Sequence, residues 1–73
     1  MPKACILIKT VPTATDKILD RVRKTGGVNK AFPVFGRCDI VAFVEAPYDE
    51  IGKISTVINS IDGVRTSETL PEA

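Results

Sequence analysis

Polar groups that can bind a small molecule are concentrated at two turns of this 73-residue chain. A carboxylate that lies beside backbone N–H groups and hydroxyls can bind an ammonium and a carboxylate at the same time. A free amino acid presents this pair of groups. The sequence therefore predicts a small-molecule site formed by the two turns. The candidate residues are Gly36, Arg37, Cys38, Asp39, Ser67 and Thr69.

Each of these residues also has a purely structural explanation. Gly36 can supply the positive φ angle that a hairpin connection needs, and Asp39 can cap that turn. Ser67 and Thr69 can be ordinary residues of an edge strand. Composition and spacing leave both explanations open.

Catalytic and metal-binding chemistry has little support in this sequence. The chain contains no histidine, and its two cysteines, Cys5 and Cys38, lack the CxxC spacing of a metal or redox site. Cys38 has no neighbouring base, so a small side chain filling a turn is a simpler explanation than a catalytic thiol. We expect no enzyme activity, no cofactor, and free thiols in a reducing cytoplasm. No apolar stretch is long enough to predict a membrane span.

The charge is nearly balanced in total but not along the chain. A net charge of +1 argues against a dedicated nucleic-acid-binding domain. Eight of the ten Lys and Arg residues lie at or before Arg37, whereas seven of the nine acidic residues follow it. This division predicts either one basic and one acidic surface helix or two halves that meet complementary halves of a partner subunit.

The apolar spacing predicts four strands and two helices. Strands are expected at residues 4–8, 28–34, 40–44 and 64–70, where apolar residues run together or alternate. The first helix is expected from Thr13 to about Thr25, with Thr13 and Asp16 forming a capping box. The second is expected to begin near Pro47 and to carry an apolar stripe. Residues 70–73 are expected to form a tail. The stripe consists of Ile51, Ile54, Ile58 and Ile61, with Val57 at its margin.

The order strand, helix, strand, strand, helix, strand predicts one α+β domain over residues 1–73. Right-handed crossovers place both helices on one face of a four-stranded antiparallel sheet, with the first and third strands central. This is the ferredoxin-like arrangement. The other face, with Cys5, Leu7, Val41 and Phe43, then has no cover within the chain. Because a core of this size is marginal, we expect a dimer formed sheet to sheet.

Two other functions of this fold lack their characteristic residues. An RNA-binding sheet would carry paired aromatic residues on its central strands, but Phe43 has aliphatic neighbours. A metallochaperone would carry a cysteine pair in the first loop, and residues 11–13 contain none.

The two turns and their flanking strands resemble a known family. Residues 34–41 (VFGRCDIV), 61–64 (IDGV) and 67–69 (SET) are similar to the effector-binding domain of the Lrp/AsnC transcriptional regulators, also called the RAM domain. The resemblance extends from Lys3 to Leu70. It implies a ferredoxin-like module that dimerises through its sheets and assembles into an octamer or decamer-like ring, with free amino acids as effectors bound between dimers.

The resemblance also implies roles for individual residues. Gly36 and Asp39 match the family's Gly-x-x-Asp corner, with Asp39 expected to bind the ligand's ammonium group. Ser67 and Thr69 match its hydroxyl pair, while Cys38 stands where the family usually has an aromatic residue. The chain resembles the stand-alone form without a helix-turn-helix, so we expect co-assembly with full-length regulators rather than direct DNA binding. The alternatives are a small dimeric α+β barrel enzyme and a ligand-free structural module.

Overall fold

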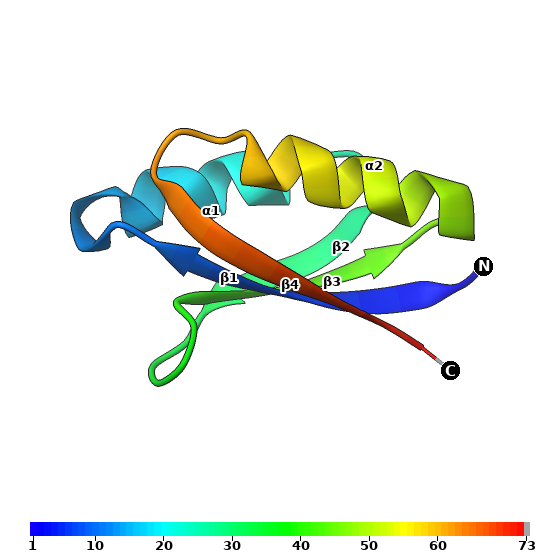
Figure 1. The fold of residues 1–73 in the computed structure, drawn as a ribbon, viewed down its shortest axis with the longest axis horizontal. Coiled ribbons are helices and arrows are strands. Elements are labelled where there is room, and N and C mark those ends of the chain that lie inside the picture. The colour runs from blue at the N-terminus through cyan, green and yellow to red at the C-terminus, as the bar shows by residue number, and fades with distance from the viewer. Residues whose placement is uncertain (73) are drawn as a thin grey trace.

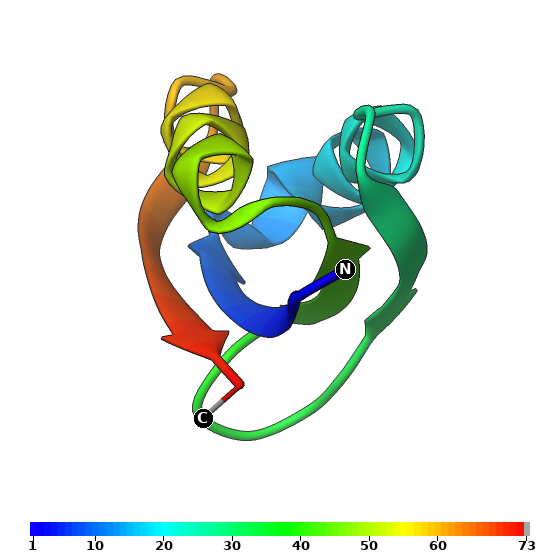
Figure 2. The same cartoon turned by 90° about the vertical axis from the view of Figure 1, so that its right-hand side faces the viewer.

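The computed structural model describes residues 1–72 as a four-stranded antiparallel sheet with two helices on one face (Figures 1 and 2). The strand order is β2-β3-β1-β4, so the first and third strands are central. The predicted α+β ferredoxin-like fold is therefore confirmed. The elements are β1 (Lys3–Thr10), the 3-10 turn η1 (Pro12–Ala14), α1 (Thr15–Arg23), β2 (Val28–Pro33), β3 (Ile40–Glu45), α2 (Tyr48–Asn59) and β4 (Val64–Pro71).

The core lies between the sheet and the two helices. Alternate residues of β1 and β3 face the helices, because successive side chains of a strand point to opposite faces. α1 buries Ile18, Leu19 and Val22 against the sheet. The predicted apolar stripe of the second helix is confirmed, and Ile61 packs against the core from beyond the end of α2. The largest fully buried side chains are Ile6, Ile8, Ile18, Ile40, Ile58, Val22 and Val44.

The predicted start of the first helix is wrong. Thr13 lies in η1, and α1 begins at Thr15 without a side-chain cap, so Thr13 and Asp16 form no capping box. Thr15 Oγ1 is instead bonded to Thr10 Oγ1 at 2.7 Å. The tighter 3-10 turn moves the helix start two residues along, away from Thr13. The second helix begins at Tyr48, directly after Pro47.

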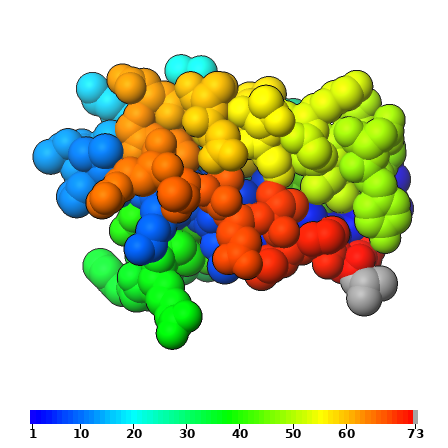
Figure 3. Space-filling view, viewed as in Figure 1, coloured from blue at the N-terminus to red at the C-terminus, as the bar shows by residue number. Residues whose placement is uncertain are grey.

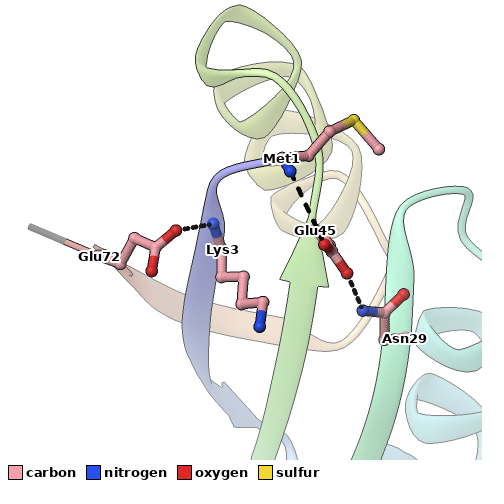
Figure 4. A network of polar contacts seen from close by, with 5 residues as sticks. All are labelled: Met1, Lys3, Asn29, Glu45 and Glu72. Carbon is pink, nitrogen blue, oxygen red and sulfur yellow. Dashed lines mark hydrogen bonds and ion pairs between the residues drawn. The ribbon is translucent and has the colours of Figure 1, made fainter.

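The predicted C-terminal tail is also wrong for the residues that the structure describes. Leu70 and Pro71 belong to β4 and pair with Cys5 and Ala4 of β1. Glu72 continues this contact. Its backbone N–H donates to the Lys3 carbonyl at 2.8 Å, and its carboxylate accepts the Lys3 N–H at 2.9 Å (Figure 4 shows the carboxylate contact). The backbone N–H and C=O of Lys3, the first residue of β1, need hydrogen-bond partners, and Glu72 supplies both. Ala73 lies outside the described residues.

The strand ends near the N-terminus are joined by a second set of polar contacts (Figure 4). The Glu45 carboxylate accepts a hydrogen bond from Asn29 Nδ2 at 3.1 Å and lies 4.0 Å from the Met1 amino group. Exposed contacts of this kind contribute little to stability. No helix within residues 1–72 is long and apolar enough to cross a membrane.

The turn that precedes β4 should be sensitive to any side chain at Gly63. Its φ angle is +97°, and an added Cβ would lie 3.0 Å from Ala14 Cβ and from Ile18 Cδ1. We expect Gly63→Ala to lower the free energy of unfolding by about 2–4 kcal/mol, from left-handed strain and crowding together. Urea unfolding would measure the change.

Gly26→Ala is the matched control, because Gly26 has no positive φ angle and an added Cβ would meet nothing within 4 Å. Equal stability of the two variants would contradict the assignment of strain to Gly63.

Candidate ligand-binding site

The loop at residues 34–39 joins β2 to β3 and projects from the sheet on the side away from the helices (Figures 1, 2 and 3). Gly36 has a φ angle of +121°, as the predicted hairpin turn requires. The Val34 N–H donates to the Asp39 carbonyl at 2.9 Å and closes the loop. Phe35, within this loop, is fully exposed. The loop is thus held at its base while its middle stands in solvent.

Asp39 fixes the loop to the end of β1. Its N–H donates to the Ile8 carbonyl at 2.9 Å, and its Oδ2 accepts the Thr10 N–H at 2.8 Å. Thr10 is buried, and its hydroxyl is bonded to Thr15 at the start of α1. A short polar chain therefore connects the loop, β1 and α1. One oxygen of the Asp39 carboxylate has a structural partner, and its predicted contact with a ligand ammonium stays a prediction.

A hollow of about 340 Å³ lies between this loop and the ends of β1 and β4. It brings together three of the residues predicted from sequence, namely Arg37, Cys38 and Ser67. Gly36, Asp39 and Thr69 do not line it. The full lining is Leu7, Lys9, Arg37, Cys38, Thr66, Ser67 and Glu68.

The hydroxyls of Ser67 and Thr69 point toward α2 and not toward the loop. Ser67 Oγ donates to Asn59 Oδ1 at 2.9 Å, and Thr69 Oγ1 is bonded to Ser55 Oγ. Ser67 and Thr69 pair with Ile8 and Ile6 of β1, whose side chains are buried beneath the helices. Both hydroxyls therefore stabilise the contact between α2 and β4, and Ser67 borders the hollow without its hydroxyl free.

Sequence reasoning missed Lys9, Thr66 and Glu68. Alternation along a strand separates Thr66 and Glu68 from Ser67 and Thr69, but the sequence does not show which pair faces the helices. The strand register decides this: Glu68 pairs with Leu7 and Thr66 with Lys9, residues of the face without helices. Only the pairing of β4 with β1 therefore places these side chains beside the loop.

Three charged side chains of the hollow have no charged partner within residues 1–72. The ion pairs there join Lys24 to Asp20, Lys53 to Glu50, and the chain's amino group to Glu45. Lys9, Arg37 and Glu68 belong to none of them. The hollow therefore offers two cations and one carboxylate to a ligand.

Beyond the hollow, the helix-free sheet face is mainly apolar. Lys30, which is opposite Phe43 in the strand register, places its ammonium 5.7 Å from the ring centroid of Phe32. Phe32 and Phe43 lie with ring centroids 5.9 Å apart, and Phe43 and Leu70 are each 44% exposed. Burial raises the pKa of the Cys5 thiol above its ordinary value, and the nearby Cys38 adds to the shift. As expected, no element within residues 1–72 covers this face. We call its apolar residues the open face. They are Cys5, Leu7, Phe32, Val41, Phe43 and Leu70.

Comparisons with known proteins find relatives among solved structures. No protein-family model and no curated protein matches the chain. TTHA0845 from Thermus thermophilus is 27% identical and superposes over 100% of this chain and 94% of its own, with a TM-score of 0.96.

Two further solved structures share this fold. FFRP-DM1 is 20% identical with a TM-score of 0.93 over 100% of both chains. AsnC of E. coli is 19% identical with a TM-score of 0.84, and the match covers 97% of this chain and 50% of AsnC. The chain thus shares its fold with FFRP-DM1 and with AsnC, and the resemblance inferred from its sequence is confirmed at the level of the fold.

Proposed function

We propose that this protein is a regulatory module of the Lrp/AsnC type that binds a free amino acid and catalyses no reaction. The observation that carries the proposal is the hollow between the hairpin loop and β4. It places Arg37 and Cys38, from the family's Gly-x-x-Asp corner, against charged and polar residues of two strands. Asp39 holds this corner in position through Thr10. The fold shared with AsnC supports a regulatory role.

We further propose that a second copy of the chain covers the part of the open face that does not border the hollow, namely Cys5, Phe32, Val41, Phe43 and Leu70. Large apolar side chains of this face, among them Phe43 and Leu70, are partly exposed to solvent. Their burial would stabilise an interface, because apolar area removed from water contributes about 25 cal/mol per Å². A 73-residue chain gains much of its stability from such contacts. Dimers then assemble into a larger ring, with ligands bound where dimers meet.

A full-length regulator with the same domain would present an equivalent sheet face. FFRP-DM1 matches this chain over its entire length, whereas AsnC matches it over 50% of its own. The fold that this chain shares with AsnC supports co-assembly with regulators of that kind. We place its action in the cytoplasm, because the free thiols of Cys5 and Cys38 suit a reducing compartment.

Calorimetric titration of the assembled protein with each of the twenty amino acids tests the ligand proposal. We expect saturable heat with at least one of them. Arg37→Gln should weaken that binding roughly tenfold or more, since a charge-assisted hydrogen bond is lost, and should leave stability unchanged. Arg65→Gln, at an exposed position of β4 outside the hollow, is the matched control. Absence of heat with all twenty amino acids would contradict the proposal.

A further inference from the structure

We infer that the ligand of this hollow is an acidic amino acid, with one ammonium and two carboxylate groups. The inference rests on the proposed function and narrows its ligand class. Lys9 and Arg37 supply two positive charges at the hollow, and Glu68 supplies one negative charge. A free aspartate or glutamate presents the complementary set. A neutral amino acid would leave one of the two cations without a partner.

The strand register sets where two of these charges lie. Leu7 pairs with Glu68 and Lys9 pairs with Thr66, so Lys9 and Glu68 are diagonal neighbours on the helix-free face. Diagonal neighbours of an antiparallel pair lie about 7–8 Å apart. They form no ion pair in the structure, whose salt bridges lie elsewhere within residues 1–72. The Lys9 ammonium and the Glu68 carboxylate can therefore bind opposite ends of one small ligand.

Arg37 borders the same hollow and belongs to the hairpin loop, whereas Lys9 and Glu68 belong to strands. Lys9 and Arg37 both border this space, and like charges in a shared hollow repel one another until an anion binds. Arginine also matches a carboxylate with two parallel hydrogen bonds. Arg37 is thus suited to the second carboxylate of the ligand, and Lys9 to the first.

The size and lining of the hollow agree with a ligand of this class. A volume of about 340 Å³ lies at the lower end of the range for small-molecule sites. Leu7 and Cys38 are partly buried and give it an apolar floor for the methylene carbons of the ligand. No aromatic residue lines it. A short, highly charged ligand therefore fits better than a large apolar one.

Calorimetric titration of the full chain with ligands that each lack one charged group tests how much each charge of the ligand contributes to binding. We expect glutamate or aspartate to bind at least tenfold more tightly than glutamine, which lacks the second carboxylate, and than glutarate, which lacks the ammonium group. Leucine should bind no better than glutamine. Because all three contacts are ionic, affinity for the acidic amino acid should fall as salt rises.

Two variants test which residue of the hollow binds which charged group of the ligand. Glu68→Gln should weaken acidic amino acid binding roughly tenfold and remove the preference over glutarate. Arg37→Gln should remove the preference over glutamine while retaining that over glutarate. Glu50→Gln changes the same charge at an exposed position of α2, outside the hollow, and should alter neither preference.

The outcomes distinguish this inference from the function on which it rests. Tight binding of a neutral amino acid, with none of an acidic one, would overturn the ligand class and leave the proposed function standing. Unchanged glutamate binding by both Glu68→Gln and Arg37→Gln would overturn the assignment to this hollow. Absence of heat with any amino acid would overturn the proposed function as well.

Discussion

Replacing Ile6 with alanine is expected to lower the free energy of unfolding by about 2–5 kcal/mol. Ile6 is 0% exposed and lies in the central strand β1, between Ala42 of β3 and Thr69 of β4. Its small neighbour Ala42 cannot fill the space that a shortened side chain leaves. Domains of this size have only a few kcal/mol of stability. The variant should therefore be largely unfolded at the melting temperature of the parent protein.

Leu7→Ala is the matched control for this prediction. The residue is adjacent in β1 but points to the open face and is only partly buried. Urea unfolding at a protein concentration low enough to keep both variants monomeric should show a much smaller loss for Leu7→Ala than for Ile6→Ala. A larger loss for Leu7→Ala than for Ile6→Ala would contradict the assignment of the core to the helix side of the sheet.

Replacing Phe43 with glutamate is expected to convert the proposed dimer into monomers at micromolar concentration. Phe43 lies on β3, beside Cys5 and Phe32 of the open face, and is 44% exposed in the single chain. In a sheet-to-sheet dimer the new carboxylate would lose its water in a mainly apolar interface. Even with Lys30 opposite it in the strand register, this desolvation should cost about 3 kcal/mol or more. That cost corresponds to a rise of more than about a hundredfold in the dissociation constant. Light scattering or sedimentation would measure the mass.

Val57→Glu controls for the added charge. Val57 is an apolar residue of α2 that is 51% exposed, comparable to Phe43, but it lies on the helix layer. The proposed dimer should withstand this change. If Val57→Glu dissociates the protein and Phe43→Glu does not, then the subunits meet through the helices and the sheet face is not the interface.

The sequence determined the order of elements and the residues of the core. Uninterrupted apolar runs in β1 and β3 predicted central strands, because such a strand needs cover on both faces. Helical spacing of isoleucines predicted the buried side of α2, and Gly36 predicted a turn with a positive φ angle. These features depend on local periodicity and on the conformational preference of single residues. They can therefore be read from neighbouring positions alone.

Only the tertiary structure decided which groups meet at the hollow. The register of β4 against β1 directs the hydroxyls of Ser67 and Thr69 to α2 and the carboxylate of Glu68 to the loop. The same pairing extends β4 to Pro71, where a tail was expected. A shift of one residue would exchange the two faces of the strand. Because that register is set by contacts between residues about sixty positions apart, no local pattern in the sequence records it.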